Sequence, residues 1–366
     1  MLAPPFPIEL PSLLIDERIC RKNIRRMLQK AKANQLILRP HFKTHHSVEI
    51  GRWFREEGVQ AITCSSLLMA EHFASDDWQD ITVAFPVNVL EMDRINRLAA
   101  KIQLQVLVEA TESLDALEKE LKHPVGAFVK IDVGAGRSGI LWDDTAAIDQ
   151  LVQRLAHSPK VQFKGFLTHA GHSYKSRDRS TVQTIYQQTS TRLQALKDRH
   201  QSNWPHLILS AGDTPCFSQL DHFVELDEIR PGNFVFYDLM QEQIGSCTFD
   251  DIALVLACPV VARHAHRQEL VLYGGAVHFS KEYILRADGS KNFGRLAEWT
   301  EGGWSPLPED NYLRAVSQEH GLLKVTPSVF SQLSVGSVVP ILPIHSCLSA
   351  NLMPHYHALD GQRISK

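Results

Sequence analysis

Short apolar runs alternate with amphipathic stretches from residue 16 to about residue 240. This spacing is typical of repeated β-α units. The longest amphipathic stretches, Asp16–Ala33 and Arg179–His200, place their apolar residues on one helical face. The predicted strands are Leu36–Leu38, Ala61–Cys64, Ile81–Phe85, Leu104–Val108, Ala127–Ile131, Phe163–Thr168, Leu207–Leu209 and Phe223–Ile229. Such strands with returning helices predict an α/β fold, a (β/α)8 TIM-like barrel over residues 15–242.

The pattern changes after about residue 245. Strand-like runs such as "DIALVLACPVVARHA", "ELVLYGGAVHFS", "GLLKVTP" and "VGSVVPILP" follow one another, with turn sequences between them. This predicts a separate β domain over residues 243–366. Residues 1–14 could join that domain before the barrel begins, and the sequence leaves this open.

The composition of the chain argues against several classes of function. A chain of 366 residues with 44% hydrophobic content can bury a large core, and its net charge of -3 offers no basic field for nucleic acid or anionic lipid. The proline-broken N-terminus is not typical of a signal peptide, and no apolar run is long enough to span a membrane. Six scattered cysteines without CxxC pairs suit a reducing cytoplasm. We therefore expect a cytoplasmic protein with a small-molecule substrate.

Chemistry in this barrel fold collects at the C-terminal ends of the strands. Lys43 follows the first predicted strand, in "RPHFKTHHSV". A lysine in a polar loop is most often a surface residue. Here, however, Arg39 and the imidazoles of His41 and His45 could hold its amine in a low-water pocket and depress its pKa, as a nucleophilic amine requires.

Two glycine-containing loops follow the last two predicted strands. "SAGDTP" carries Gly212 and Thr214, and "RPGNFVFYD" carries Gly232 and Asn233. Each loop alone is more typical of a tight turn, but this pair of loops is the frequent phosphate site of the fold. A phosphate facing a lysine is the layout that pyridoxal 5'-phosphate (PLP) needs.

Arg137 lies in "VKIDVGAGRSGI". The residues alone favour two roles for its side chain equally. It could point at the ring nitrogen of such a cofactor, or it could form a salt bridge with Asp132 or Asp143.

Seven motifs in order resemble the D-serine dehydratase and D-threonine aldolase family of alanine-racemase-like, fold type III PLP enzymes. They are "SLLID", "RPHFKTH", "VKIDVGAGRSGI", "GFLTHAGHSY", "SAGDTP", "RPGNFVFYD" and "PIHSC". The resemblance implies that Lys43 is the Schiff-base lysine and that Arg137 faces the pyridine nitrogen. The cofactor-binding residues that it implies are Lys43, His41, Arg137, His169, Tyr174, Ser210, Gly212, Thr214, Gly232, Asn233 and Tyr237. His46 stands where the family usually has a lysine, a change at the rim of the pocket.

"ILPIHSCLS" places His345 and Cys347 two residues apart after a β run. On a strand such residues point to the same side and can reach one ion together, although a buried histidine beside a buried cysteine is the commoner reason for this spacing. The resemblance implies a metal at this pair, and imidazole with thiolate suits Zn2+, one ion per active site. His355 and His357, in "HYH", share a strand face in the same way, and we expect them to be surface polar residues.

The resemblance implies a PLP- and zinc-dependent D-3-hydroxyamino-acid dehydratase that releases a 2-oxo acid and ammonia. In the family, cysteine at the second ligand position goes with the dehydratases and aspartate with the aldolases, so Cys347 favours elimination. A D-threonine aldolase is the alternative, and an amino-acid racemase or a non-catalytic PLP carrier is less favoured. A homodimer is expected from the resemblance alone.

Overall fold

The structure is a computed structural model that describes residues 2–366. It divides into two compact units, each described here by itself. The barrel unit comprises Arg25–Lys43 and Gly51–Gly232, and the β unit comprises the N-terminal residues up to Ile24, Thr44–Ile50 and Asn233–Lys366.

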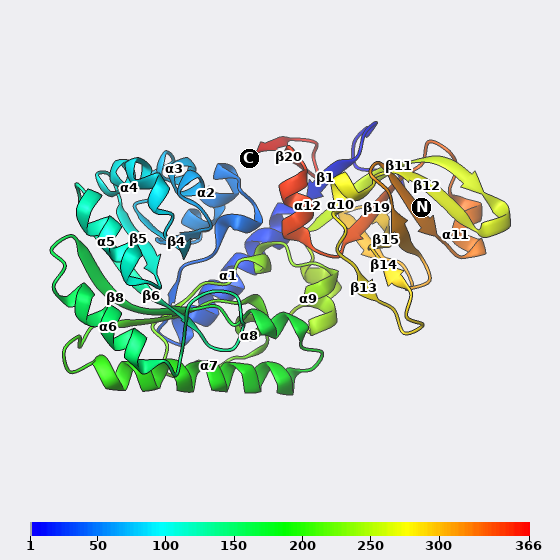
Figure 1. Cartoon of the computed structure of the whole chain (residues 1–366). Helices are drawn as coiled ribbons and strands as arrows, with labels where there is room; N and C mark the ends of the chain where they lie inside the picture. The colour runs from blue at the N-terminus through cyan, green and yellow to red at the C-terminus, as the bar shows by residue number, and fades with distance from the viewer. Residues whose placement is uncertain (1) are drawn as a thin grey trace. The chain divides into compact units, whose positions relative to one another are not determined.

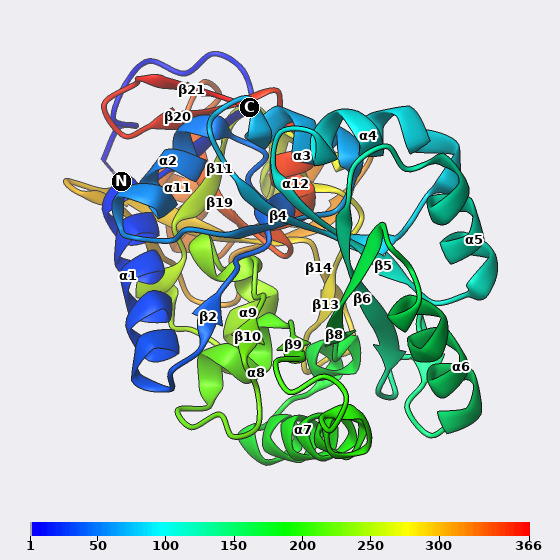
Figure 2. The same cartoon turned by 90° about the vertical axis from the view of Figure 1, so that its left-hand side faces the viewer.

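The barrel unit contains a parallel sheet in the order β2-β10-β9-β8-β6-β5-β4-β3. An isolated parallel bridge between His41 and Thr63 links the two ends of this order, so the barrel is nearly closed (Figure 2). A short strand, β7, adds to β6. The strands are β2 (Ile37–Leu38), β3 (Ile62–Cys64), β4 (Asp80–Pro86), β5 (Gln103–Val108), β6 (Val125–Asp132), β7 (Ile140–Leu141), β8 (Val161–Thr168), β9 (Ile208–Ala211) and β10 (Glu228–Ile229).

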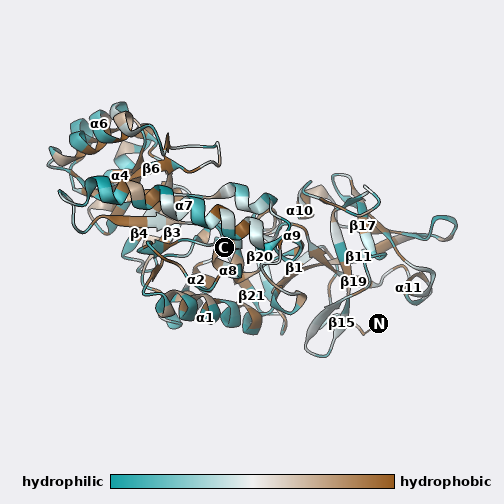
Figure 3. Cartoon of the chain, turned by 90° about the horizontal axis from the view of Figure 1, so that it is seen from below, coloured by the Kyte–Doolittle hydropathy of each residue, from teal (hydrophilic) through white to brown (hydrophobic). Residues whose placement is uncertain are grey.

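Helices return between the strands. They are α1 (Glu17–Ala33), α2 (Val48–Glu56), α3 (Leu67–Ala74), α4 (Met92–Ala99), α5 (Thr111–Glu120), α6 (Thr145–Ala156), α7 (Arg179–His200) and α8 (Thr214–Gln219). The start of α7 is fixed by Asp178, whose carboxylate accepts a hydrogen bond from the Thr181 backbone N–H at 2.7 Å. Hydrophilic and hydrophobic residues alternate along α1 and α7 in Figure 3, as expected of amphipathic helices.

The eighth predicted strand is shorter than expected. Only Glu228 and Ile229 pair with neighbouring strands, whereas the residues from Phe223 onward form an irregular segment. Glu225 has a φ of 65°, which takes the chain out of an extended conformation. Phe223 is nevertheless buried, with its ring 5.1 Å from that of Phe217. In the sequence, buried apolar residues of such a loop give the same pattern as a buried strand.

The β unit is built on a ten-stranded, mainly antiparallel sheet (Figure 1). Strand β1 lies within it, antiparallel to β11 and parallel to β20. The strands are β1 (Ser12–Ile15), β11 (Leu254–His264), β12 (Glu269–Tyr273), β15 (Gly294–Thr300), β16 (Gly303–Pro306), β17 (Tyr312–Val316), β18 (His320–Lys324), β19 (Val338–Pro343), β20 (His355–Ala358) and β21 (Arg363–Ser365), with a separate hairpin of β13 (Ile284–Leu285) and β14 (Lys291–Asn292).

Short helices complete the β unit: α9 (Leu239–Ile244), α10 (Ala276–Phe279), α11 (Pro327–Gln332) and α12 (Ser346–Leu352). The run "ELVLYGGAVHFS" was expected to be a strand throughout, but β12 ends at Tyr273 and α10 follows. Gly274 makes this turn with a φ of 159°, and a Cβ there would lie 2.5 Å from Cys258 Sγ.

The fold predicted from the sequence is confirmed: a parallel barrel is followed in the chain by a mainly antiparallel β structure. The limits at residues 242 and 243 stay predictions. Within residues 2–366, no helix has both the length and the apolar character needed to cross a bilayer.

Candidate active site

Lys43 lies in a short 3-10 turn, Phe42–Thr44, directly after β2. The turn is anchored by Phe42, which is fully buried and has its ring 4.8 Å from Phe73 and 5.2 Å from Trp78. The Lys43 backbone N–H donates to His41 Nδ1 at 3.3 Å. Buried aromatic packing thus fixes the backbone while the Lys43 side chain is exposed.

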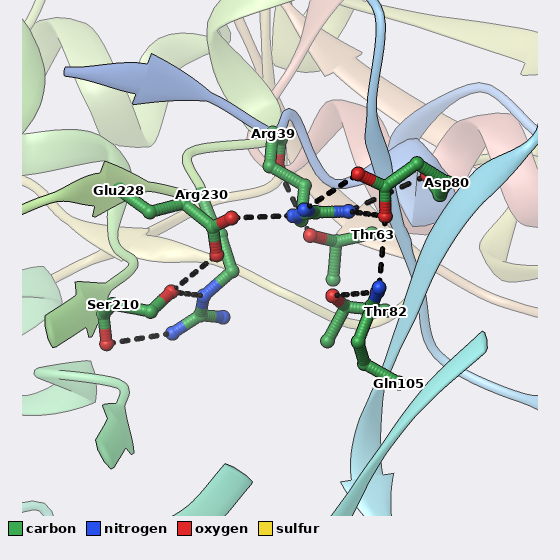
Figure 4. Close-up of polar contacts among 8 residues, drawn as sticks. All are labelled: Arg39, Thr63, Asp80, Thr82, Gln105, Ser210, Glu228 and Arg230. Atoms are coloured by element: carbon green, nitrogen blue, oxygen red, sulfur yellow. Dashed lines mark hydrogen bonds and ion pairs between the residues drawn. The ribbon is translucent and has the colours of Figure 1, made fainter. Parts of the chain in front are cut away.

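Arg39 does not take the place beside the Lys43 amine that the sequence suggested. Lys43 is exposed, and the Arg39 guanidinium is engaged elsewhere, donating to Glu228 at 2.5 Å and to Asp80 at 2.7 Å (Figure 4). A buried guanidinium needs paired carboxylates, and both partners lie far from Arg39 in the sequence. Arg39 therefore belongs to the interior of the barrel.

His169 is the residue around which the predicted cofactor residues gather. Its Nδ1 hydrogen-bonds the Gly212 carbonyl, and because a carbonyl only accepts, Nδ1 carries the proton. Burial lowers the pKa of His169 well below its usual value, and the positive charges of Lys43 and Arg137 lower it further. The ring is therefore neutral, and Lys43 and Arg137 both lie within electrostatic reach of it.

Arg137 does not form the salt bridge that the sequence left open: within residues 2–366 it has no ion pair with Asp132 or Asp143. The Asp132 carboxylate instead accepts backbone N–H groups from the following loop, Gly134 at 2.9 Å and Ala135 at 2.8 Å among them. The loop is wound around Asp132, and the Arg137 side chain is left exposed.

Polar groups for an anion meet at the start of α8. The Tyr174 hydroxyl accepts a hydrogen bond from the Thr214 backbone N–H at 3.2 Å, and Asp213 caps the helix through Cys216 N at 2.7 Å. The Thr214 hydroxyl is buried and has no hydrogen-bond partner among the described residues. A buried donor without a partner is uncommon, so the chain has a hydroxyl prepared for a ligand.

Gly212 completes this cradle. A Cβ at this position would lie 3.0 Å from Arg230 Cβ and 3.1 Å from an Arg230 guanidinium nitrogen, which is closer than ordinary packing allows. Arg230 is fully buried, and although burial lowers its pKa to about 10, it is cationic at neutral pH. A glycine beside a buried cation, next to an unpartnered hydroxyl, fits a phosphate group.

Ser210 has a different role from the one expected. Its hydroxyl donates to Glu228 at 2.6 Å and accepts from Arg230 Nε at 2.7 Å (Figure 4). Arg230 also donates to the Thr168 carbonyl. The Ser210 hydroxyl therefore supports Arg230 and is already engaged.

Gly232 ends the barrel unit, whereas Asn233 and Tyr237 belong to the β unit. The Asn233 side-chain amide donates to Asp238 at 2.7 Å and approaches Cys347 Sγ at 3.5 Å. The Asn233 side chain is therefore engaged within the β unit, and a phosphate role for this turn stays a prediction. Tyr237 is 1% exposed and has a φ of 49°.

His345 and Cys347 do come together, but not on a strand. His345 is the N-cap of α12 and Cys347 lies in its first turn. The turn is held by Asp238, whose carboxylate accepts from the Ser346 backbone N–H at 2.9 Å. The prediction that both residues lie on a strand was wrong, because the segment turns into a helix at Ser346. Asp238, distant in the sequence, accepts the hydrogen bond that holds the start of this helix.

The electrostatics of His345 are set by its neighbours. Burial lowers the pKa of His345, but the thiol of Cys347 and the carboxylate of Asp238, 3.7 Å from Nδ1, outweigh it and raise the pKa to about 9. Cys347 is 9% exposed and Thr44, the residue after Lys43, lies 3.4 Å from its Sγ. Within residues 2–366 no group of three or more His, Cys, Asp or Glu side chains is arranged for a metal. An ion here would have two protein ligands from the described residues, one fewer than the three of most catalytic zinc sites, and its other positions would be open to water or substrate.

Sequence reasoning missed three residues of these surroundings: Lys130, Arg230 and Asp238. Lys130 is 4% exposed on β6, and burial followed by the charges of Arg230 and Arg137 lowers its pKa to about 7. A lysine in the middle of an apolar strand run was the available signal. Arg230 and Asp238 begin and end the motif "RPGNFVFYD".

The nearly closed parallel barrel, followed in the chain by a mainly antiparallel β structure, defines an alanine-racemase-like fold. The family model of the alanine racemase N-terminal domain matches residues 15–239, and that of the serine dehydratase domain matches residues 253–359. The chain belongs to the alanine racemase family, in the branch with a D-serine dehydratase domain.

Curated relatives cover nearly the whole chain. A D-serine dehydratase from Dictyostelium discoideum is 27% identical over 97% of this chain and 94% of its own length. A D-threo-3-hydroxyaspartate dehydratase from Delftia sp. is 28% identical over 97% of this chain and 95% of its own length. A D-threonine aldolase from Arthrobacter sp. is 24% identical over 94% of this chain and 87% of its own length.

Solved structures agree with the fold. The D-threo-3-hydroxyaspartate dehydratase from Delftia sp. HT23 has a TM-score of 0.90 at 24% identity, covering 100% of this chain and 99% of its own. A cysteine-to-alanine mutant of a D-threo-3-hydroxyaspartate dehydratase, solved in the metal-free form, has a TM-score of 0.90 at 25% identity, with the same coverage.

Proposed function

We propose that this chain is a PLP- and zinc-dependent dehydratase of D-3-hydroxyamino acids that releases a 2-oxo acid and ammonia. The observation that carries the proposal is the placement of His345 and Cys347 together at the start of α12, with Asp238 3.7 Å from His345 Nδ1. Imidazole and thiolate favour Zn2+, and elimination of a β-hydroxyl gains more from such an ion than racemisation does.

The family implies PLP, which supplies an electron sink for a carbanion at the substrate's α-carbon when it is bound. Lys43 would hold its aldehyde, Arg137 would face its ring nitrogen, and the phosphate would lie against Gly212, Thr214 and the Gly232–Asn233 backbone. Tyr174 holds the Thr214 backbone in place. Neutral His169, with Nδ1 bonded to Gly212, would line the cofactor without adding a charge.

Within this proposal the residues of the chain divide the work. The Lys43 amine would take the α-proton, since it is exposed and close enough to His169 to lower the pKa of that ring. His345 and Cys347 would hold Zn2+, which supplies a Lewis acid for a departing hydroxide. Asp238 orients both ligands through Ser346 and Asn233.

The names of the relatives support this assignment. Two of them are dehydratases of D-serine and D-threo-3-hydroxyaspartate. The dehydratase in the metal-free form carries a cysteine-to-alanine change. D-serine is the first substrate to test, followed by D-threonine and 3-hydroxyaspartate. A homodimer and a cytoplasmic location stay predictions.

A D-threonine aldolase activity, yielding glycine and an aldehyde, is the second candidate because one relative carries that name. Product analysis separates the two. Purified protein with PLP and zinc is incubated with a panel of D-amino acids, with and without a chelator, and 2-oxo acid, ammonia, glycine and aldehyde are each quantified. We expect 2-oxo acid and ammonia, both lost with the chelator. Glycine and aldehyde instead would establish the aldolase, and no product from any substrate would contradict both.

The Cys347→Asp variant sharpens this experiment. An aspartate oxygen weakens the site for Zn2+ and favours harder metals, so the variant should lose elimination with zinc. Cys247→Asp, a change at a half-buried cysteine outside the proposed site, is the matched control.

A further inference from the structure

His355 and His357 are not ordinary surface polar residues. They lie two positions apart on β20, both half-buried, and their rings meet with Nε2 atoms 3.1 Å apart and ring centroids 4.9 Å apart. Their Nδ1 atoms are buried and have no hydrogen-bond partner among residues 2–366. Among the described residues the two rings therefore share a single hydrogen bond, in which their Nε2 atoms face one another.

The sheet holds this arrangement in place. His357 lies opposite Leu14 of β1 on one side and opposite Arg363 of β21 on the other. Tyr356, between the two histidines, points to the opposite face, is fully buried and donates from its hydroxyl to the His45 carbonyl at 2.6 Å. The histidine faces are thus set by a strand paired on both sides and by an anchored tyrosine.

The separation of the two nitrogens matches that of ligands around a metal ion. With Zn–N distances of about 2.0 Å, two nitrogens are about 3.3 Å apart in a tetrahedral site and about 2.8 Å apart at adjacent corners of a square-planar one. The observed 3.1 Å lies between these values. A hydrogen bond has the same length, so an ion can replace the shared proton with little movement of either ring.

Space for further ligands lies alongside. The pair borders a groove of about 540 Å³ whose other walls include Phe6, Tyr273 and His278. The Phe6 ring lies 5.5 Å from that of His357. Water can therefore complete the coordination of an ion on the open side.

We propose that His355 and His357 form a divalent transition-metal site, distinct from the His345–Cys347 pair. Imidazole nitrogens select ions such as Ni2+, Zn2+ and Cu2+. The nearby cationic groups Arg363 and Lys366 oppose a dication, and no thiolate is present, so this site binds more weakly than an imidazole-thiolate pair. As a consequence, the total metal content of the protein exceeds the content of the proposed catalytic site.

The test is a Ni2+ titration of the full-length protein without a polyhistidine tag, carrying PLP and one equivalent of Zn2+. Equilibrium dialysis counts the bound Ni2+. We expect one saturable Ni2+ per chain, with binding weakened about 10- to 100-fold or more in His355→Asn and in His357→Asn, since even loss of a group that only supports a ligand costs that much. Unchanged thermal unfolding shows that each variant is folded, and His357→Gln replaces any variant that is not.

The chain supplies its own control. His264 and His266 have the same spacing, but their ring centroids are 6.1 Å apart. The double variant His264→Asn/His266→Asn should bind Ni2+ as the wild type does. The proposal is overturned if the wild type binds no Ni2+, if the control variant loses as much binding as His357→Asn, or if binding disappears in Cys347→Ser, which would place the ion on the other pair.

Discussion

Two polar regions of the barrel unit differ in how completely their groups are satisfied. In the interior network of Figure 4, Arg39 bonds Glu228 and Asp80, and Ser210 bonds Glu228 and Arg230. At the proposed cofactor site, Lys43 and Arg137 are exposed, and the Thr214 hydroxyl is buried without a hydrogen-bond partner among residues 2–366. A saturated network gives rigidity, whereas a buried hydroxyl without a partner marks a place where a ligand is expected. Substitutions in the first region should lower stability, and those in the second should lower activity.

Lys43→Ala should have the largest effect on activity. We expect kcat to fall about 10³-fold or more, because the proposed base and cofactor attachment point is lost. The free energy of unfolding of the cofactor-free protein should stay within about 0.5 kcal/mol of wild type. Steady-state kinetics and a urea titration measure the two quantities. Lys175→Ala is a control outside the proposed site. A stable variant with full activity would show that Lys43 is not needed for the reaction.

Glu228→Leu should show the opposite behaviour. Removing Glu228 takes one of two carboxylate partners from the buried Arg39, which keeps only Asp80, and we expect a loss of about 3 kcal/mol in the free energy of unfolding. The double variant Arg39→Met/Glu228→Leu should recover part of this loss because the incompletely paired Arg39 charge is removed as well. If the single variant unfolds at the wild-type urea concentration, the network does not stabilise the barrel.

Thr214→Val tests the unpartnered hydroxyl. Because that hydroxyl has no hydrogen-bond partner in the part of the chain that the structure describes, its removal should leave the free energy of unfolding within about 0.5 kcal/mol of wild type. Loss of a phosphate contact should nevertheless weaken PLP binding about tenfold. Cofactor titration followed by absorbance gives the affinity. Thr189→Val, at another buried threonine without a partner, controls for the change of shape. Equal PLP affinity in Thr214→Val and wild type would exclude the cradle.

Lys130→Met should change the pH dependence of stability. The pKa of Lys130 is lowered to about 7 in the folded chain from 10.5, so between these values the unfolded chain binds more protons. Stability due to this residue therefore rises with pH across that window, by at most about 1.4 kcal/mol per pH unit, and is lowest below pH 7. The methionine variant should show a flatter profile in urea titrations from pH 7 to pH 10. An unchanged slope would mean that Lys130 keeps its proton when buried.

The sequence predicted the elements whose signals are local. Helix α7 has the predicted limits because Asp178 caps it and its apolar residues repeat with helical spacing. Partners distant in the chain could not be foreseen. Arg39 was expected beside Lys43 but bonds Glu228, and Asp238 turns the segment of His345 and Cys347 into the start of a helix. In both cases one carboxylate, far away in the sequence, decides where a polar side chain lies.

The placement of β1 also determines when parts of the chain can fold during synthesis. Ile15 is made before any barrel strand, but its partner in β11, Leu254, follows only after the last of them. At about 5–20 residues per second, the interval is on the order of 10 to 50 s. The barrel strands can pair during that time. Strand β1 therefore finds its first partner only after the strands of the barrel have been made, and its parallel partner β20 follows later still.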